Sequence, residues 1–307
     1  MDNTEASNSP NRGPVIAFTF LALIWGYNWV VMKIAMQYCP PMIFALLRVG
    51  GGAAVILAIV TFSGSSLKLQ YPWKTVLLGL LQTSGFVGMI SWSVAMGAAG
   101  KSAVFAYTMP FWVILLSWPF LGERIRGWQW LAVVLALAGL VFTVQPWNTG
   151  AAFRNNLLGV AAGLCWGASV IVVKKIPIDN RIEMLRVTGW QMVFGLPLII
   201  IAAFILPEPA ITWNAIFIVA IIYNILAGTV IAWLLWYYVL QKLSANASGL
   251  SALTVPVVGV VAAWIQLGEQ PGLFEGIGMI LILVALTMLA FHAKKDKFRA
   301  TEPKDTK

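Results

Sequence analysis

Two pairs of side chains, one in each half of the sequence, join an aromatic ring to a hydrogen-bonding group. Trp25 and Asn28 are three residues apart in LALIWGYNWVVMK, and Trp166 and Ser169 repeat this spacing in AGLCWGASVIVVK. Residues three apart lie on one face of a helix. Each pair could therefore hold an amphipathic solute, with the ring against its apolar part. The alternative for each residue is a role in helix packing or in a hydrogen bond between helices.

The segments that carry these pairs are long and apolar. Apolar residues make up 60% of the 307, charged residues only 10%, and the mean hydropathy is +0.85. This composition is typical of an integral membrane protein and excludes an ordinary soluble domain. The apolar runs are continuous rather than alternating, which favours helices over the strands of a β-barrel. The predicted fold class is therefore an all-α integral membrane protein.

Ten apolar runs are each long enough for a membrane-spanning helix, which needs roughly 20 residues. The first run carries Trp, Asn and Lys in its second half and lacks a small-residue cleavage site, so we expect it to be retained rather than removed as a signal peptide. The ten predicted spans are 14–36, 41–62, 73–96, 101–120, 127–146, 156–176, 184–206, 213–237, 246–266 and 273–292.

Lysine and arginine residues fall on alternate loops. If the N-terminus is inside, Lys101 and Arg154 are the only cations in the outer loops. This asymmetry follows the positive-inside rule and predicts a multi-pass protein of the cell (inner or plasma) membrane with both termini cytoplasmic. This placement of the basic residues also argues against the interpretation that the net charge of +9 serves to bind nucleic acid. We expect residues 1–13 and the basic tail 293–307 to be disordered and cytoplasmic, and the tail could also be attracted to anionic lipid.

The sequence contains an internal duplication. The run TMPFWVILLSWPFLGER contains Pro110, and TVPVVGVVAAWIQLGEQ repeats its Thr-x-Pro, its Trp and its Leu-Gly-Glu around Pro256. Together with the two Trp-Gly segments, this repeat divides the chain into five-helix halves at 14–150 and 151–292. Because five is odd, the second half must enter the membrane with the opposite orientation. Inverted repeats of this kind are typical of secondary transporters.

The repeated prolines lie near the middle of their spans. A proline inside a helix leaves the carbonyl four residues earlier without its donor, here the carbonyls of Ala106 and Ala252. Paired interruptions in corresponding helices point to the central binding site of a transporter, where Pro110 and Pro256 would mark the helix breaks. The alternative is that both prolines only kink their helices for packing.

Other aromatic and polar side chains lie within the predicted spans. Each could line a central cavity, and each could instead serve packing or a hydrogen bond between helices. Their pairing across the repeat favours the two Trp pairs. The candidate substrate-binding residues are Trp25, Asn28, Gln82, Tyr107, Trp112, Trp166, Ser169, Asn224, Trp233 and Tyr237.

Charged side chains are rare within the spans. Arg48 lies about seven residues into the second span, roughly 10 Å from its end. A guanidinium at that depth needs partners, and both helix-end carbonyls and an anionic group of a substrate fit this need. Lys33 and Lys174 lie near helix ends and can extend to the surface. Glu123 and Glu269, from the repeated Leu-Gly-Glu, are expected to cap helix termini.

No carboxylate lies in the middle of a predicted span. The 11 acidic residues fall in loops, tails or first turns, and the single histidine, His292, ends the last span. A proton carrier within the membrane would need such a group, so we expect facilitated transport or exchange rather than strongly proton-driven pumping. A membrane enzyme would likewise need a buried nucleophile and base or a metal cluster. The sequence therefore predicts no enzyme, no metal site and no cofactor.

Several motifs together carry a resemblance to a known family. LIWGYNWVVMK, FALLRVGGG and YTMPFWVILLSWPFLGERIRGWQWLAVVLALAGLVF, with weaker copies in the second half, resemble EamA-type members of the drug/metabolite transporter superfamily. The resemblance covers about 14–292. It implies a ten-helix carrier whose cavity is lined mainly by the first, third, fourth, sixth, eighth and ninth helices.

The resemblance does not imply one substrate. It places amino acids and related small metabolites first, exported or exchanged by alternating access. Amphipathic drugs, organic cations and organic acids are the alternative substrates, and a non-transporting membrane scaffold is a further alternative. The predicted partners are a small-molecule substrate and the lipid bilayer. A monomer is sufficient for this mechanism, and the sequence leaves the oligomeric state open.

Overall fold

The computed structural model describes residues 12–122, 127–147, 150–178, 180–206, 209–236 and 254–301. All regular secondary structure in these ranges is helical. In the first half the helices are α1 (Arg12–Ala35), α2 (Pro41–Phe62), α3 (Pro72–Leu78), the π-helix η1 (Gly79–Gly88), α4 (Met89–Met96), α5 (Ala99–Ala106), α6 (Met109–Leu121) and α7 (Gly127–Val144). In the second half they are α8 (Ala151–Lys174), α9 (Arg181–Ile205), α10 (Ala215–Ile225), the π-helix η2 (Leu226–Ile231), α13 (Thr254–Leu267) and α14 (Leu273–Thr301).

These elements make ten apolar helices. Within the described residues, seven are long and apolar enough to cross a membrane, at 41–62, 72–96, 99–121, 127–144, 151–174, 181–205 and 215–236. Three shorter apolar helices lie at 19–35, 255–267 and 273–288. The predicted all-α fold with ten helices is confirmed. The third span is built from α3, η1 and α4, and the fourth is built from α5 and α6.

Proline and glycine set several helix boundaries. Pro41 and Pro72 stand in the first turns of α2 and α3, where a missing backbone N–H costs no hydrogen bond. Gly122 ends α6 with φ +71°, and Gly268 follows α13 with φ +66°. Glycine adopts this left-handed conformation without steric cost. The repeated Leu-Gly therefore ends the fourth helix of each half in the same way.

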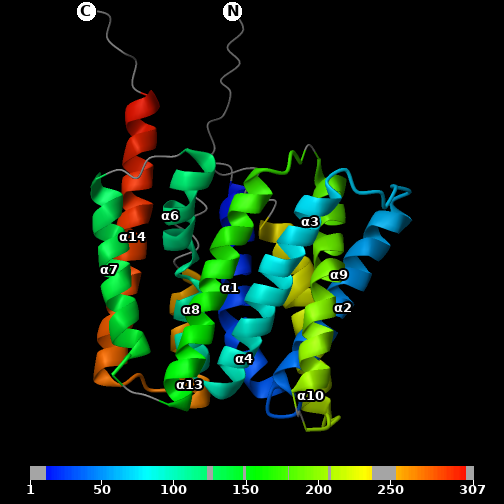
Figure 1. Cartoon of the computed structure of the whole chain (residues 1–307), viewed down its shortest axis with the longest axis horizontal. Helices are drawn as coiled ribbons and strands as arrows, with labels where there is room; N and C mark the ends of the chain where they lie inside the picture. Colours follow the sequence, from blue (N-terminus) through cyan, green and yellow to red (C-terminus); the bar gives the residue numbers. More distant parts are fainter. Residues whose placement is uncertain are drawn as a thin grey trace, which may run out of the picture.

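The two halves run through the bundle in opposite directions (Figure 1). The beginning of α1 and the end of α14 lie at the same face, whereas α7 ends and α8 begins at the opposite face. The packing follows the same relation. α2 packs on α9 and α7 packs on α14, so the second and fifth helices of each half meet their own counterparts. The first helix of each half packs on the fourth helix of the other half: α1 on α13, and α8 on α5 and α6.

The two Trp-Gly glycines allow these crossed contacts. A Cβ atom placed on Gly26 would lie 2.5 Å from Cγ1 of Val258 on α13. A Cβ atom placed on Gly167 would lie 2.7 Å from Cβ of Trp112 on α6. Val258 and Trp112 are equivalent positions in the two Thr-x-Pro repeats. The duplicated motifs therefore form one contact, built twice, between the first helix of one half and the fourth helix of the other.

Two terminal segments differ from our expectation. α1 begins at Arg12, inside the segment 1–13 that we expected to be disordered, and residues 1–11 lie outside the described residues. α14 continues to Thr301, so the described part of the basic tail 293–307 is helical rather than disordered. An apolar helix propagates into a polar sequence at little cost when that sequence has good helix formers such as Ala and Lys.

Adding one methyl group at the contact between α1 and α13 should destabilise the protein. We expect Gly26→Ala to lower the free energy of unfolding by about 1–3 kcal/mol, because the new Cβ overlaps the β-branched Val258. Gly127→Ala is the matched control, since nothing lies within 4 Å of a Cβ at that position on α7. Thermal unfolding of the purified protein, followed by loss of the monodisperse peak, measures both. Equal stability of the two variants would contradict this packing.

Candidate functional site

Aromatic side chains from both halves meet in the interior of the bundle. The ring of Trp166 stacks on Phe86, with 4.7 Å between centroids, and meets Tyr107 edge to face at 5.4 Å. Trp25 approaches the edge of Trp166 at 6.4 Å. Its other side is covered by Trp233 at 5.7 Å and Trp236 at 5.9 Å. We call this set the central aromatic cluster: Trp25, Phe86, Tyr107, Trp166, Trp233 and Trp236.

The residues of the cluster come from five helical spans and lie next to the glycine contacts of α1 and α8. Trp25 and Trp166 directly precede Gly26 and Gly167 on α1 and α8, so the glycines bring the rings together at mid-helix. Phe86 comes from η1, and Trp233 and Trp236 follow η2 in the span 215–236. Edge-to-face and offset-stacked pairs are the favoured geometries of aromatic rings. Ring faces and ring edges of this kind could both contact an apolar or aromatic solute.

Both halves widen their third helix into a π-helix beside the cluster. η1 and η2 occupy corresponding positions of the repeat, and each is flanked by α-helix in the same span. π-helical turns are rare and are frequently found at functional sites. In η2 the carbonyl of Gly228 accepts a hydrogen bond from Trp25 Nε1 at 3.2 Å. The π-helix therefore fixes the orientation of a cluster ring.

The fourth helix of the first half is broken at the cluster. α5 ends at Ala106, and Pro110 stands in the first turn of α6, where it needs no donor. The interruption lies at Tyr107 and Thr108, before the proline, rather than inside a continuous helix kinked by Pro110. Thr108 Oγ1 accepts a hydrogen bond from Trp112 Nε1 at 3.1 Å and donates one to the carbonyl of Phe105 at 2.6 Å. The break orients Tyr107 toward Trp166.

The corresponding region of the second half is described only in part. Pro256 is buried in the first turn of α13. Tyr237 lies outside the described residues, as do Ala252 and the part of the predicted ninth span before Thr254.

The predicted polar residues have different surroundings. Asn28 is 4% exposed, and its Oδ1 has no partner among the described residues. Ser169, its counterpart, donates to the carbonyl of Trp166 in its own helix at 2.7 Å. Asn224 donates to the carbonyl of Ala220 at 3.0 Å, and its buried Oδ1 also has no partner in the described part of the chain. Gln82 is buried in η1. The unpaired amide oxygens can accept hydrogen bonds, whereas the Ser169 proton is already engaged.

Arg48 lies between the two halves. Its Nε donates to Thr229 Oγ1 at 3.3 Å, and its Nη1 contacts Met32 Sδ at 3.3 Å. Thr229 belongs to η2 and Met32 to α1, so Arg48 reaches the same elements that hold Trp25.

One end of the bundle is closed by charged side chains. Lys33 Nζ donates to the carbonyls of Val94, Ala95 and Gly97, which terminate α4. The Glu269 carboxylate accepts the backbone N–H groups of Ala99 at 2.8 Å and Gly100 at 3.0 Å, at the start of α5. Glu269 therefore caps a helix, as predicted. The capped helix belongs to the other half.

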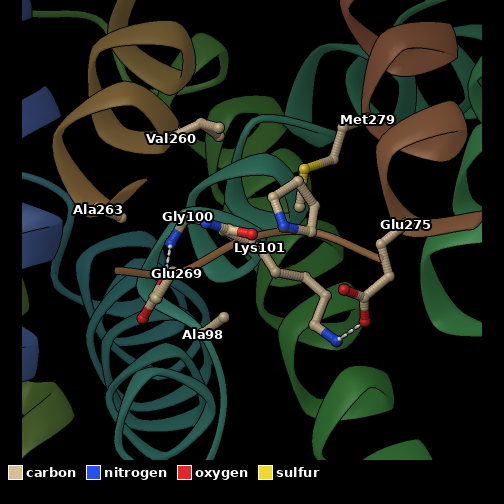
Figure 2. Close-up of a pocket in the computed structure, with 10 residues that line it drawn as sticks. Ala98, Gly100, Lys101, Val260, Ala263, Glu269, Glu275 and Met279 are labelled. Carbon is tan, nitrogen blue, oxygen red and sulfur yellow. Dashed lines mark hydrogen bonds and ion pairs between the residues drawn. The ribbon is translucent and has the colours of Figure 1, made fainter. Parts of the chain in front are cut away.

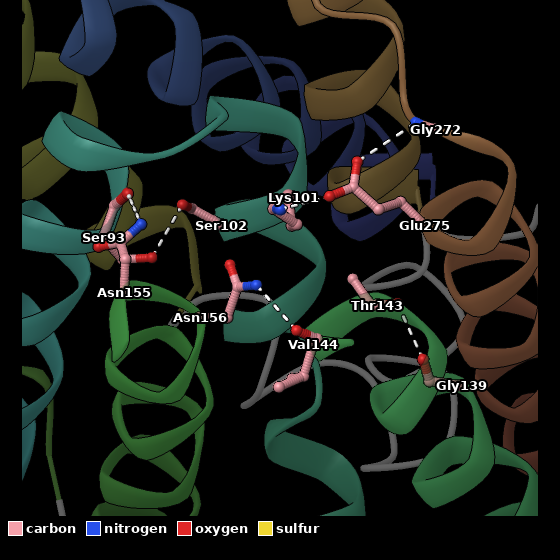
Figure 3. A network of polar contacts seen from close by, with 10 residues as sticks. All are labelled: Ser93, Lys101, Ser102, Gly139, Thr143, Val144, Asn155, Asn156, Gly272 and Glu275. Atoms are coloured by element: carbon pink, nitrogen blue, oxygen red, sulfur yellow. Dashed lines mark hydrogen bonds and ion pairs between the residues drawn. The ribbon is translucent and has the colours of Figure 1, made fainter. Parts of the chain in front are cut away.

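Further polar contacts join the same end. Lys101 on α5 pairs with Glu275 on α14 at 2.5 Å, beside a pocket between α5, α13 and α14 (Figure 2). Asn155 at the start of α8 donates to the carbonyl of Ser93 at 3.2 Å, and Asn156 donates to that of Val144 at 3.1 Å (Figure 3). These bonds tie both halves together at one face. We call the charged contacts between the halves, from Glu269 to Ala99 and Gly100 and between Lys101 and Glu275, the end latch.

The duplication, the inverted packing and the interior cluster agree with a comparison of sequences. Residues 13–145 match the model of the EamA-like transporter family, and residues 154–291 match it a second time. The chain belongs to this family. As an EamA-like transporter it is a multi-pass integral membrane protein that acts on a small-molecule substrate, and it is not an enzyme.

Several relatives are similar over most of the EamA-like chain. The uncharacterized transporter YoaV of Bacillus subtilis (strain 168) is 27% identical, over 90% of this chain and 96% of that protein. A riboflavin transporter of Rhizobium johnstonii is 27% identical, with 93% and 94% covered. A probable amino-acid metabolite efflux pump of Escherichia coli (strain K12) is 25% identical, with 88% and 92% covered. One crystal structure shares the fold, with a TM-score of 0.64 and 20% identity, over 92% of this chain and 98% of that one.

The structure adds residues that the sequence did not indicate. Phe86 and Trp236 were absent from the candidate set, although each touches a predicted cluster residue. Their positions in the two spans that contain π-helices could not be read from the sequence, so the sequence did not indicate that they reach the cluster. Among the described residues, no group of three or more His, Cys, Asp and Glu side chains is arranged to hold a metal ion.

Removing the Glu269 cap should open the latched end. We expect Glu269→Ala to increase this opening about tenfold, because a lost helix cap costs about 1 kcal/mol or slightly more. A cysteine at Ala98, in a chain with Cys39→Ala and Cys165→Ala, should then react faster with a hydrophilic maleimide. Gln270→Ala is the control, since Gln270 is the exposed neighbour of Glu269 in the sequence and its loss leaves the cap in place. Equal rates in both variants would contradict this role of Glu269.

Proposed function

We propose that this EamA-like transporter exports or exchanges amino acids or closely related small metabolites. The observation that carries the proposal is the central aromatic cluster, which joins rings from both halves in the middle of the bundle. Asn28 supports it, because its buried amide oxygen has no partner among the described residues and can accept a hydrogen bond from an ammonium group. The similarity to a probable amino-acid metabolite efflux pump supports the same substrate class.

A planar aromatic metabolite is the second candidate substrate. The stacked pair of Phe86 and Trp166 is a surface suited to a flat ring system. The similarity to a riboflavin transporter favours this alternative over organic cations. Both candidate substrates would bind the same cluster. A planar aromatic metabolite should therefore compete with a labelled amino acid in one transport assay, and their relative affinities separate the two candidates.

The inverted halves and the end latch support alternating access as the mechanism. The halves would rock about the crossed Trp-Gly contacts, which keep the cluster fixed while the two ends open in turn. The described conformation is latched at the end that contains Lys101 and Glu269. In the opposite conformation we expect Glu123, the counterpart of Glu269 in the repeat, to close the other end. We propose that residues 14–150 and 151–292 are the two moving units.

Transport should be measured with the purified full chain in proteoliposomes. We expect saturable uptake of labelled aromatic or aliphatic amino acids, stimulated by unlabelled substrate on the opposite side. Trp166→Ala should lower the rate by about tenfold or more, because a lost ring contact is worth on the order of 1 kcal/mol beyond the area it buries. Trp118→Ala is the control, since Trp118 is 54% exposed on α6 and pairs only with Trp130 among the described rings. If folded protein moves no amino acid, the amino-acid assignment is wrong.

The driving force has its own test. The described carboxylates Glu183, Glu269 and Glu275 stand at helix ends or in a connection, away from the cluster. We therefore expect the exchange rate to be the same with and without an imposed pH gradient. A rate that collapses without the gradient and follows its size would contradict the proposed exchange mechanism.

A further inference from the structure

We propose that Arg48 binds an anionic group of the substrate, such as a carboxylate, in a subsite next to the central aromatic cluster. This inference rests on the proposed function and narrows it: the substrate is an organic anion or a zwitterion rather than an organic cation.

No counterion faces Arg48 among the residues that the structure describes. Its bonds within the described part of the chain go to the hydroxyl of Thr229 and the thioether of Met32, neither of which is anionic. The Lys101–Glu275 pair is the one salt bridge between described side chains, so no described carboxylate faces Arg48. A guanidinium has five N–H donors, and these two contacts use two of them. The remaining donors have no protein partner in the described part of the chain, so they are available to a ligand that reaches them.

Arg48 and the cluster share one turn of η2. Trp25 Nε1 bonds the carbonyl of Gly228, and Arg48 Nε bonds the hydroxyl of Thr229, the next residue. The Thr229 hydroxyl donates in turn to the carbonyl of Asn224 at 2.8 Å, so it is oriented to accept from Arg48. Thr229 is therefore a bridge between the guanidinium and the widened helix that positions a cluster ring.

The same face of α1 continues this arrangement. Trp25, Asn28 and Met32 are spaced by three and four residues, which places them along one helix face. Asn28 Oδ1 lies against Gly228, where a Cβ would be 2.8 Å away. The aromatic ring, the amide oxygen and, at Met32, the guanidinium that reaches over from α2 therefore follow one another along this face of α1. An α-amino acid carries the matching groups: an apolar side chain, an ammonium and a carboxylate.

The inverted repeat supplies an internal comparison. Arg48 lies in LLRVGG and Arg186 in MLRVTG, at corresponding positions of α2 and α9. Arg186 Nη1 donates to the carbonyl of Lys68 at 3.1 Å, in the connection that follows α2. The second-half arginine therefore anchors a loop. Arg48 has no carbonyl partner among the described residues, so the structural role suggested for it, bonding helix-end carbonyls, is not the one it performs here.

The physical argument is one of desolvation. A charged side chain within a membrane protein is costly unless another charge or several dipoles compensate it. A carboxylate offers a guanidinium two parallel charge-assisted hydrogen bonds, which are stronger than bonds to neutral groups. A bound anion would therefore offset the cost of placing the guanidinium within the bundle. An organic cation would add a second positive charge and be disfavoured.

Matched ligands test the proposal on the purified full chain. We would compare thermal stabilisation by 3-phenylpropionate with that by its amide, and by phenylalanine with that by phenylalaninamide. Each carboxylate should bind about tenfold more tightly than its neutral or cationic counterpart. Arg48→Gln should abolish the preference, and Arg186→Gln should retain it.

Arg48→Lys keeps the charge but loses the planar fork, so it should weaken the preference without removing it. This variant also decides the matter if Arg48→Gln does not fold. Wild-type protein that shows no preference for either carboxylate overturns the proposal, and so does a preference that survives Arg48→Gln. A carboxylate preference without transport of any amino acid would instead retain Arg48 and remove the amino-acid assignment.

Discussion

The crossed contact between the first helix of one half and the fourth helix of the other half is the constraint on which the structure depends. Gly26 lies against Val258, and Gly167 lies against Trp112, because neither glycine has a side chain. In a bilayer, apolar surface alone does not drive helices together, so close packing at small residues must supply the association. The tryptophans that precede these glycines are thereby brought into contact in the interior. The same short motif sets both the fold and the position of the cluster.

Charged groups show how the protein tolerates ions within an apolar bundle. Every helix end leaves backbone N–H or carbonyl groups without partners inside the helix. Lys33 donates to such carbonyls at the end of α4, and Glu269 accepts from such N–H groups at the start of α5. Their cost is balanced by the backbone dipoles they meet. Arg48 meets a hydroxyl and a thioether instead. This contrast separates a structural charge from one available to a ligand.

Much of the architecture could be predicted from the sequence, because membrane helices must satisfy their backbone internally and therefore appear as apolar runs of sufficient length. The Trp-Gly and Thr-x-Pro repeats also indicated Trp25, Trp166 and Tyr107, which the structure brings together. Phe86 and Trp236 could not be predicted. They belong to spans that contain π-helical turns. An apolar run in a sequence does not reveal where the backbone changes from the i→i+4 hydrogen bonds of an α-helix to the i→i+5 bonds of a π-helix.

The proline motif was informative in position and misleading in detail. The break at Tyr107 and Thr108 precedes Pro110, since a proline is better placed in a first turn than in a helix interior. Ser169 shows the same limit, because the repeat predicted a counterpart of Asn28 but could not show that its hydroxyl bonds its own helix. The type of each repeated residue indicated which part of the bundle it lies in. Its hydrogen-bond partner depended on how the helices pack, which the sequence does not show.

The central claim is that the aromatic cluster is reached in turn from the two sides of the membrane. The most direct test is the reactivity of one cysteine at Phe86, in a chain with Cys39→Ala and Cys165→Ala, toward a membrane-impermeant maleimide. We predict labelling from either side of sealed vesicles, slowed by a transported substrate added to the other side. Labelling from one side only, unaffected by any substrate, would contradict the account.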